Sequence, residues 1–264
     1  MTILNHTILK KKMKDNFKMM QISNKAVEVR LKNEASPNTD YQIIMTLGMN
    51  IKGIDCCKSY TLFWNGKFAQ IYDVQGQRGP QLAGNFESHA SVMALTEDSV
   101  IQNEEGNKIQ VLSFAGEVKQ VIPMAESEGE VTLMDVKGRY MAVVTQNNMI
   151  KIFDISRRQY KQIGVTRKFE MKPGVPLGEI KDIQLNCEGK KLCILADQTP
   201  FPSVRIPDTK FYIYDVDMDN FMEMEVTKDR VPVECFWDQA DPRLLAIETE
   251  YVKDMNAPEK AEAE

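Results

Sequence analysis

The chain contains few residues that could do acid–base chemistry. Its only two histidines, His6 and His89, lie far apart in the sequence. His89 follows Glu87 by two residues, and a histidine paired with a carboxylate can move protons in an active site. No nucleophile motif such as GxSxG, and no metal-binding HExxH, accompanies this pair. We therefore interpret His89 as a loop residue and expect the chain to have no catalytic residue and no enzymatic activity.

Three aspartates invite a metal-site interpretation. Asp73, Asp154 and Asp215 each stand at the end of a strand-like segment. A hard cation such as Ca²⁺ needs several oxygen ligands around one point. The spacing of these aspartates instead places them on separate repeats of the chain, so they should not share an ion. The sequence also lacks a P-loop and a GxGxxG motif. It predicts neither a metal site nor a cofactor.

The five cysteines lie in apolar runs and form no CxxC pair. An odd count in a chain of this size favours free, packed thiols in a reducing compartment. Redox chemistry at the adjacent Cys56 and Cys57 is an alternative, but two ordinary strand residues explain the pair more simply, since buried cysteine behaves as a small hydrophobic residue.

Basic residues gather in two segments, although the chain has a formal net charge of −5 and so lacks the overall charge of a nucleic-acid-binding protein. The segment 156–168 contains no acid and carries Arg157, Arg158, Lys161, Arg167 and Lys168. Such charges can protect an outer strand from edge-to-edge pairing. They could also form an interaction patch for an acidic partner or for anionic lipid headgroups. The other run, Lys10–Lys12 with Lys14, is interpreted as a solvated leading segment.

Short runs rich in Val, Ile, Tyr and Phe predict β-strands along almost the whole chain. Asn65-Gly66 separates YTLFW from KFAQIYDV, and an Asn-Gly pair between two such runs is a strong hairpin signal. No apolar run approaches the ~20 residues of a membrane helix, so we expect a soluble, intracellular protein without a transmembrane segment.

An internal repeat selects among the all-β folds. An aromatic or apolar residue followed by Asp or a small polar residue recurs as Tyr72-Asp73, Leu112-Ser113, Phe153-Asp154 and Tyr214-Asp215. The first two steps match the ~40–45 residues of a four-stranded propeller blade. The third step is longer, because Gln198–Thr209 brings three prolines, which are typical of a surface loop. Each Asp could hold the end of a third strand by accepting hydrogen bonds from the following turn.

The sequence therefore predicts an all-β, WD-repeat-like β-propeller over residues 1–252. Four substantial blades are expected at 49–87, 88–125, 127–168 and 177–227. A leading segment with a partial blade (1–48) and a second partial blade (230–252) would leave the propeller incomplete. Residues 253–264 are polar and are expected to form a disordered acidic tail or the start of a linker.

Trp237 and Asp238 stand in the second partial blade. Tryptophan is enriched in binding hot spots, which gives one interpretation. The simpler one is structural: Trp237 ends a strand and packs between blades, while Asp238, Asp241 and Arg243 organise the turn that follows.

Several segments resemble one family more specifically than a Trp-Asp dipeptide does. They are IFDISRRQYK (152–161), LFWNGKFAQIYDV (62–74), FYIYDVDMDN (211–220) and ECFWDQADPRLLAIE (234–248). These segments are similar to the second WD-repeat propeller of the large WD-repeat and tetratricopeptide subunit of intraflagellar transport complex A, the intraflagellar transport protein 140 family. Members of that family are far longer, so the chain resembles an interior piece, a split gene model or a short paralogue.

The resemblance implies a non-catalytic scaffold that works through protein–protein contacts. It implies retrograde ciliary transport and ciliary import of membrane cargo, with the other complex A subunits and membrane cargo adaptors as partners. The implied location is the cilium or flagellum and the cytoplasm near the basal body. From the residues alone, a cytoplasmic propeller adaptor that binds peptides or anionic lipid through the basic patch remains the alternative.

Overall fold

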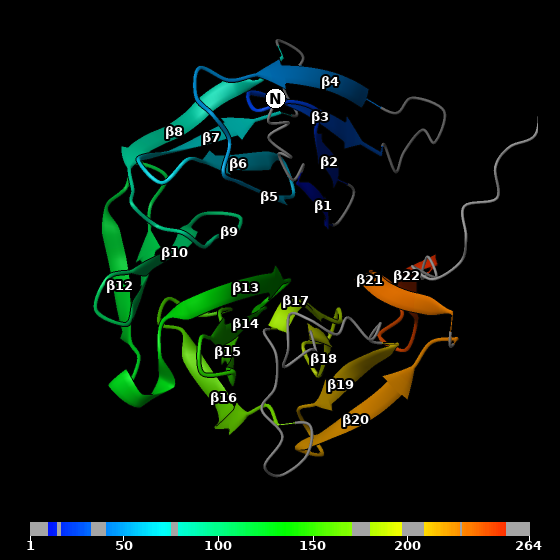
Figure 1. The fold of residues 1–264 in the computed structure, drawn as a ribbon. Helices are drawn as coiled ribbons and strands as arrows, with labels where there is room; N and C mark the ends of the chain where they lie inside the picture. The colour runs from blue at the N-terminus through cyan, green and yellow to red at the C-terminus, as the bar shows by residue number, and fades with distance from the viewer. Residues whose placement is uncertain are drawn as a thin grey trace, which may run out of the picture.

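In a computed structural model the chain forms six antiparallel β-sheets arranged around a common axis (Figure 1). The structure describes residues 10–14, 17–32, 41–74, 79–170, 180–196, 209–227 and 229–251. Within these residues, five sheets have four strands and the sixth has two. Each sheet is a meander, because its strands pair with their sequence neighbours.

The four-stranded sheets are named blades 1 to 5 in chain order. Blade 1 contains β1 (Lys11–Lys14), β2 (Phe17–Gln21), β3 (Ala26–Leu31) and β4 (Tyr41–Thr46). Blade 2 contains β5 (Gly53–Cys57), β6 (Tyr60–Trp64), β7 (Phe68–Asp73) and β8 (Gln81–Glu87). Blade 3 contains β9 (Met93–Leu95), β10 (Val100–Glu104), β11 (Lys108–Leu112) and β12 (Val118–Pro123).

Blade 4 follows a short 3₁₀ helix, η1 (Glu126–Glu128), and contains β13 (Val131–Lys137), β14 (Tyr140–Thr145), β15 (Met149–Asp154) and β16 (Lys161–Lys168). Blade 5 contains β17 (Ile180–Leu185), β18 (Lys191–Ala196), β19 (Lys210–Asp215) and β20 (Asn220–Glu225). The two-stranded sheet contains β21 (Arg230–Trp237) and β22 (Leu245–Tyr251).

The first strand of each sheet lies nearest the axis. β1 contacts β5, β5 contacts β9, β9 contacts β13, β13 contacts β17, and β17 contacts β21. Figure 1 shows these strands around the middle of the ring and the fourth strands, such as β8 and β20, at its circumference. This arrangement is that of a β-propeller.

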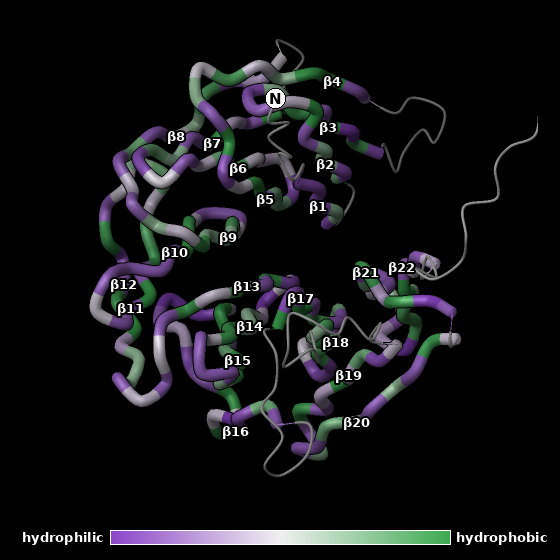
Figure 2. The backbone as a smooth tube through the Cα atoms, in the orientation of Figure 1, coloured by the Kyte–Doolittle hydropathy of each residue, from purple (hydrophilic) through white to green (hydrophobic). Residues whose placement is uncertain are grey.

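Burial follows position within a blade. The second strands β14 and β18 are buried at every residue but the first, because neighbouring blades cover both of their faces. The outermost strands β8 and β16 contain no fully buried residue. Figure 2 shows the same contrast, with hydrophobic stretches in the interior of the ring and mixed character on the outer strands. Continuous apolar runs such as YMAVVT therefore predict strands buried on both faces.

Apolar side chains join each blade to the next. Between blades 1 and 2, for example, Phe17 and Met19 pack in one cluster with Ile54 and Phe63. Similar clusters join the later blades, and the last includes Trp237 of the two-stranded sheet. Close packing also explains one glycine: a Cβ on Gly53 would lie 2.0 Å from the ring of Trp64.

The propeller class is confirmed, but the predicted blade count is wrong at the N-terminal end. Residues 1–48 were expected to hold a leading segment and a partial blade, and the described residues 11–46 form a complete four-stranded blade. The missed strand is β1, whose sequence KKMK has no apolar pattern. Carboxylates on other blades stabilise its lysines, so tertiary contacts override the weak local signal.

Blades 2 to 5 span 53–87, 93–123, 131–168 and 180–225, and β21 and β22 lie within 230–251. The proline-rich segment falls between β18 and β19, which are the second and third strands of blade 5. Residues 198–208 and the tail 253–264 lie outside the described residues. In the described part of the chain, no helix has the length and apolar character needed to cross a membrane.

Candidate interaction surface

Two of the repeated aspartates hold the turns that follow the third strands. Asp154 Oδ1 accepts a hydrogen bond from the backbone N–H of Ser156 at 2.9 Å, and Asp215 Oδ1 accepts one from Met218, also at 2.9 Å. Hydrogen bonds from the Ser156 side chain and backbone lower the pKa of Asp154. These are structural roles. Among the described residues, no group of three or more His, Cys, Asp or Glu side chains is placed to hold a metal ion.

The remaining repeat residues lie in the same structural positions. Tyr72 and Asp73 end β7, Phe153 precedes Asp154 at the end of β15, and Tyr214 precedes Asp215 at the end of β19. Each of these strands is the third of its blade. The repeat therefore marks one structural position in blades 2, 4 and 5.

Trp237 stands at the end of β21, a first strand, and so differs in position from the other repeat residues. Its side chain is buried, and Nε1 donates a hydrogen bond to the backbone carbonyl of Gln184 in blade 5 at 2.9 Å. Asp238 Oδ1 accepts hydrogen bonds from the backbone N–H groups of Ala240 and Asp241, which lower its pKa. Trp237 therefore ties the two-stranded sheet to blade 5.

His89 has no arrangement suited to catalysis. It is exposed just after β8, and its Nδ1 lies 3.3 Å from the backbone carbonyl oxygen of Gly66. Glu87 is the last residue of β8. The other histidine, His6, lies outside the described residues.

The first basic run lies at the centre of the ring. β1 places Lys14 in contact with two blades: its Nζ donates a hydrogen bond to the Leu95 carbonyl at 3.1 Å and lies 3.8 Å from Asp55 Oδ2. The Lys14 side chain is only 5 % exposed. Asp55 also accepts a hydrogen bond from the Leu95 backbone N–H at 2.7 Å, so Lys14 and Asp55 together join blades 1, 2 and 3.

Lys12 reaches a different part of the ring. Residues two apart on a strand share a face, and this places Lys12 beside Lys14. Lys12 Nζ lies 3.4 Å from Asp135 Oδ1 of blade 4. Asp135 Oδ2 accepts a hydrogen bond from the backbone N–H of Leu185 in blade 5 at 2.8 Å. Burial lowers the pKa of Lys12, but the nearby carboxylates of Asp135, Asp55 and Asp182 outweigh burial and raise it.

Lys11 completes the set by contacting the two-stranded sheet. Its Nζ forms ion pairs with Glu234 of β21 and with Glu248 of β22, the latter at 2.7 Å. The three lysines thus contact every other sheet of the ring, directly or through a carboxylate. We call the group the axial ion cluster; it contains Lys11, Lys12, Lys14, Asp55, Asp135, Asp182, Glu234 and Glu248.

The second basic segment does not form one continuous patch. Arg157 and Arg158 are exposed in the turn between β15 and β16, and Lys161 begins β16. Arg167 and Lys168 end the same eight-residue strand, which separates them from the turn by roughly 20–25 Å at the usual rise per residue. Arg167 forms an ion pair with Asp219 of blade 5, and Lys168 pairs with Glu170 at 2.6 Å.

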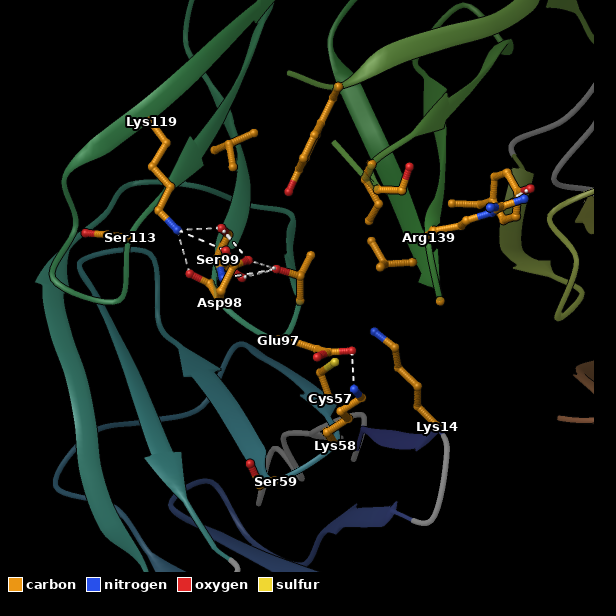
Figure 3. A pocket seen from close by; sticks show the side chains of 18 of the residues that line it. Lys14, Cys57, Lys58, Ser59, Glu97, Asp98, Ser99, Ser113, Lys119 and Arg139 are labelled. Atoms are coloured by element: carbon orange, nitrogen blue, oxygen red, sulfur yellow. Dashed lines mark hydrogen bonds and ion pairs between the residues drawn. The ribbon is translucent and has the colours of Figure 1, made fainter. Parts of the chain in front are cut away.

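The turn with Arg157 and Arg158 instead borders a large funnel at one end of the ring. The funnel has a volume of about 2250 Å³. Its walls come from turns between first and second strands and between third and fourth strands, mostly of blades 2, 3 and 4. In Figure 3, Lys119 lies beside Asp98 and Ser99 on one wall, Arg139 lies on the opposite wall, and Lys14 lies below them.

Sequence reasoning missed Arg139 and the central role of the lysines. Arg139 lies in the turn between β13 and β14, where its guanidinium stands 5.1 Å from the centre of the Tyr140 ring. That ring packs on Gly189 of blade 5, which has a φ of +68° and no room for a Cβ. The usable signals were the Gly138-Arg139 turn and the two-residue spacing of Lys12 and Lys14.

Antiparallel meander sheets whose first strands contact one another around a common axis define a β-propeller of the WD-repeat class, a fold that serves as a scaffold for protein contacts. Residues 15–228 match the family described as the IFT140 second beta-propeller. This match covers more than half of the chain, and the chain belongs to that family.

Solved propellers have the same fold at low sequence identity. The β-propeller domain of Cps50 (Swd1) from Myceliophthora thermophila superposes with a TM-score of 0.62 at 10 % identity, over 88 % of this chain and 76 % of that one. Hsv2 from Kluyveromyces marxianus gives a TM-score of 0.56 at 11 % identity, over 90 % of this chain and 75 % of that one. Both similarities concern the fold alone.

Proposed function

We propose that this chain is a non-catalytic scaffold module of intraflagellar transport complex A. In this role it supports retrograde ciliary transport and the ciliary import of membrane cargo through protein–protein contacts. Its place of action is the cilium or flagellum and the cytoplasm near the basal body. The observation that carries the proposal is the family match over residues 15–228, which spans blades 1 to 5 almost completely.

The architecture suits a scaffold. The axial ion cluster and the apolar clusters between blades occupy the interior, so the turns and outer strands remain to contact partners. Propellers commonly use such surfaces, and their function depends on the groups displayed there and not on the fold alone.

The test is recovery of complex A subunits with the tagged chain from ciliated cells, identified by mass spectrometry. The Cps50 propeller domain, tagged in the same way, is a suitable control because it has a similar fold and only 10 % identity. We expect complex A subunits with this chain and none with the control. Equal recovery with both proteins, or no recovery with a chain that is folded by circular dichroism, would contradict the proposal.

The alternative of an adaptor acting through one basic patch at 156–168 finds less support. Arg167 and Lys168 are paired with acids at the far end of β16 from Arg157 and Arg158. Only the turn residues lie at the funnel, so any ligand of this segment would bind through the funnel and not along the strand.

A further inference from the structure

The funnel is rich in positive charge. Its lining includes seven lysines and arginines but only three acidic residues, namely Lys14, Lys32, Lys58, Lys119, Arg139, Arg157 and Arg158 against Glu97, Asp98 and Glu117. The whole chain has a formal net charge of −5, so this concentration departs from the overall balance. Charge of one sign in a concave surface focuses the electrostatic field on ligands of opposite sign.

Part of that charge is already neutralised. Lys58 pairs with Glu97 at 2.5 Å, and Lys119 lies 3.6 Å from Asp98. Lys119 Nζ also donates hydrogen bonds to the Asp98 carbonyl and to Ser99 Oγ, at 2.7 and 2.9 Å. These pairs fix the blade 2 and blade 3 side of the funnel, as Figure 3 shows, and leave little charge there for a ligand.

The arginines of blade 4 differ. Arg139, Arg157 and Arg158 are exposed and form no ion pair with any described residue. The Asp154 carboxylate is near enough for Arg139 and Arg157 to help lower its pKa, but it does not pair with either of them. A guanidinium has five donors in a fixed plane that match a carboxylate in a bidentate geometry. Three such groups on two adjacent turns can hold several carboxylates.

The size and depth of the funnel favour an extended chain as the ligand. Its volume of about 2250 Å³ exceeds the roughly 300–1,000 Å³ of small-molecule pockets. Hydroxyl groups of Ser59, Ser113 and Ser156 also line it, and these can bond to a peptide backbone. A flat bilayer would not enter this concavity, whereas a narrow polypeptide segment would reach the arginines on its wall; Lys14 at the base is only 5 % exposed and already pairs with Asp55.

We propose that the funnel binds an acidic peptide segment of a partner protein in an extended conformation, with its carboxylates on Arg139, Arg157 and Arg158. This inference rests on the proposed function, because it names the chemistry of one partner of the scaffold. The binding site is confined to the turns of blade 4 and the facing wall of blades 2 and 3.

The test uses the purified chain and two fluorescein-labelled twelve-residue peptides, one of alternating Glu and Ser and one with Gln in place of Glu. Fluorescence anisotropy measures Kd. We expect the Glu peptide to bind and the Gln peptide to bind at least about tenfold more weakly, with affinity falling as salt is raised. Equal binding of both peptides, or binding of neither, would overturn the proposal.

Charge reversal locates the site. The double variant Arg157→Glu, Arg158→Glu should weaken binding of the Glu peptide at least about tenfold. The matched control is Lys161→Glu, Lys168→Glu, which makes the same change of charge on β16 outside the funnel lining. It should change Kd less than about threefold. Equal losses in the two variants would show non-specific attraction and overturn the assignment.

A membrane is tested separately with vesicles of phosphatidylcholine and phosphatidylserine in a flotation experiment. Flotation that Arg157→Glu, Arg158→Glu abolishes, together with no binding of the Glu peptide, would assign the turn to lipid and overturn the peptide proposal. Recovery of complex A subunits from cells reports on the proposed function, whereas these measurements use the purified chain alone. Failure of one is therefore distinguishable from failure of the other.

Discussion

Two basic regions of this propeller occupy opposite environments. On β1, Lys12 and Lys14 lie at the centre of the ring beside Asp135 and Asp55, with side chains 24 % and 5 % exposed. In the turn after β15, Arg157 and Arg158 lie at the rim of the funnel and form no ion pair among the described residues. The two segments differ because carboxylates from other blades pair with the lysines of β1, whereas no carboxylate among the described residues pairs with Arg157 or Arg158. The lysines therefore stabilise the fold, and the arginines remain available to a ligand.

Lys14→Met should give the largest effect on stability. It leaves the Asp55 carboxylate, 6 % exposed, without the adjacent Lys14 ammonium. Removing one member of a buried ion pair typically costs about 3–5 kcal/mol. We expect the free energy of unfolding to fall by about that amount, as measured by urea denaturation followed by tryptophan fluorescence.

The double variant Lys14→Met, Asp55→Asn is the control for this effect. Asn removes the charge and keeps an oxygen that can accept the Leu95 N–H hydrogen bond. It should recover a large part of the lost stability. If the single variant unfolds at the same urea concentration as the unmodified chain, the central lysine does not have the role assigned to it.

Asp182→Asn should give a smaller, pH-dependent effect. Burial raises the pKa of Asp182 from 3.8 to about 7, the Lys12 ammonium opposes this shift, and Asp135 and Glu234 add to it. The folded state then binds a proton that the unfolded state has lost, so this group's contribution is complete below pH 4 and disappears as the pH rises through 7.

The variant lacks this titration. Urea denaturation across a pH series should therefore give equal stabilities near pH 4 and a variant more stable by at most about 4 kcal/mol at pH 8, because one pKa unit is worth about 1.4 kcal/mol. A stability difference that is the same at all pH values would rule out a raised pKa for Asp182 as its cause.

Arg167→Ala should have a modest effect. The Arg167 pair with Asp219 joins blades 4 and 5, but the two side chains are 43 % and 36 % exposed. Ion pairs of this kind are worth about 0.2–1 kcal/mol and are screened by salt. Thermal unfolding should show a small decrease in stability at low salt that shrinks in 1 M NaCl. A loss of stability as large as that of Lys14→Met would contradict the view that ion pairs at the centre of the ring stabilise the fold more than ion pairs at its surface.

Arg157→Glu, Arg158→Glu should have the smallest effect on stability. Both side chains are exposed and have no ion pair to lose, and surface substitutions usually stay within about 0.5 kcal/mol. The urea midpoint should match that of the unmodified chain while peptide affinity falls. A clear destabilisation would mean that the turn supports the fold and is not reserved for a ligand.

The sequence predicts blades 2 to 5 well because each blade is a local meander. The recurring Tyr72-Asp73 and Phe153-Asp154 endings, and turns such as Asn65-Gly66, are set by contacts within about 40 residues. β1 could not be predicted in this way. Lys12 is 123 residues from Asp135, and Lys11 is 237 residues from Glu248, so no local pattern records the carboxylates that stabilise this strand.

The candidate interaction residues divide for a similar reason. Arg157 and Arg158 were evident as a basic pair in the sequence. Arg139 lies in another turn, and this turn lies beside theirs because β14 pairs with β15, with Tyr140 opposite Asp154. Arg167 lies at the far end of β16 from Arg157 and Arg158, although these three arginines all fall within residues 157–167. Residues close in sequence are far apart when a strand lies between them, and residues far apart in sequence are close when their turns lie at the same end of a blade.

The position of β1 has a consequence for how the chain is made. This strand leaves the ribosome before most of its partners, yet Lys11 must wait for Glu234 and Glu248, near the other end of the described chain. Contacts between residues this far apart in sequence form slowly, because the intervening chain must first be ordered. During synthesis, β1 can pair with β2 at once, but the Lys11 ammonium has no carboxylate partner until β21 and β22 have been made, so its ion pairs form last.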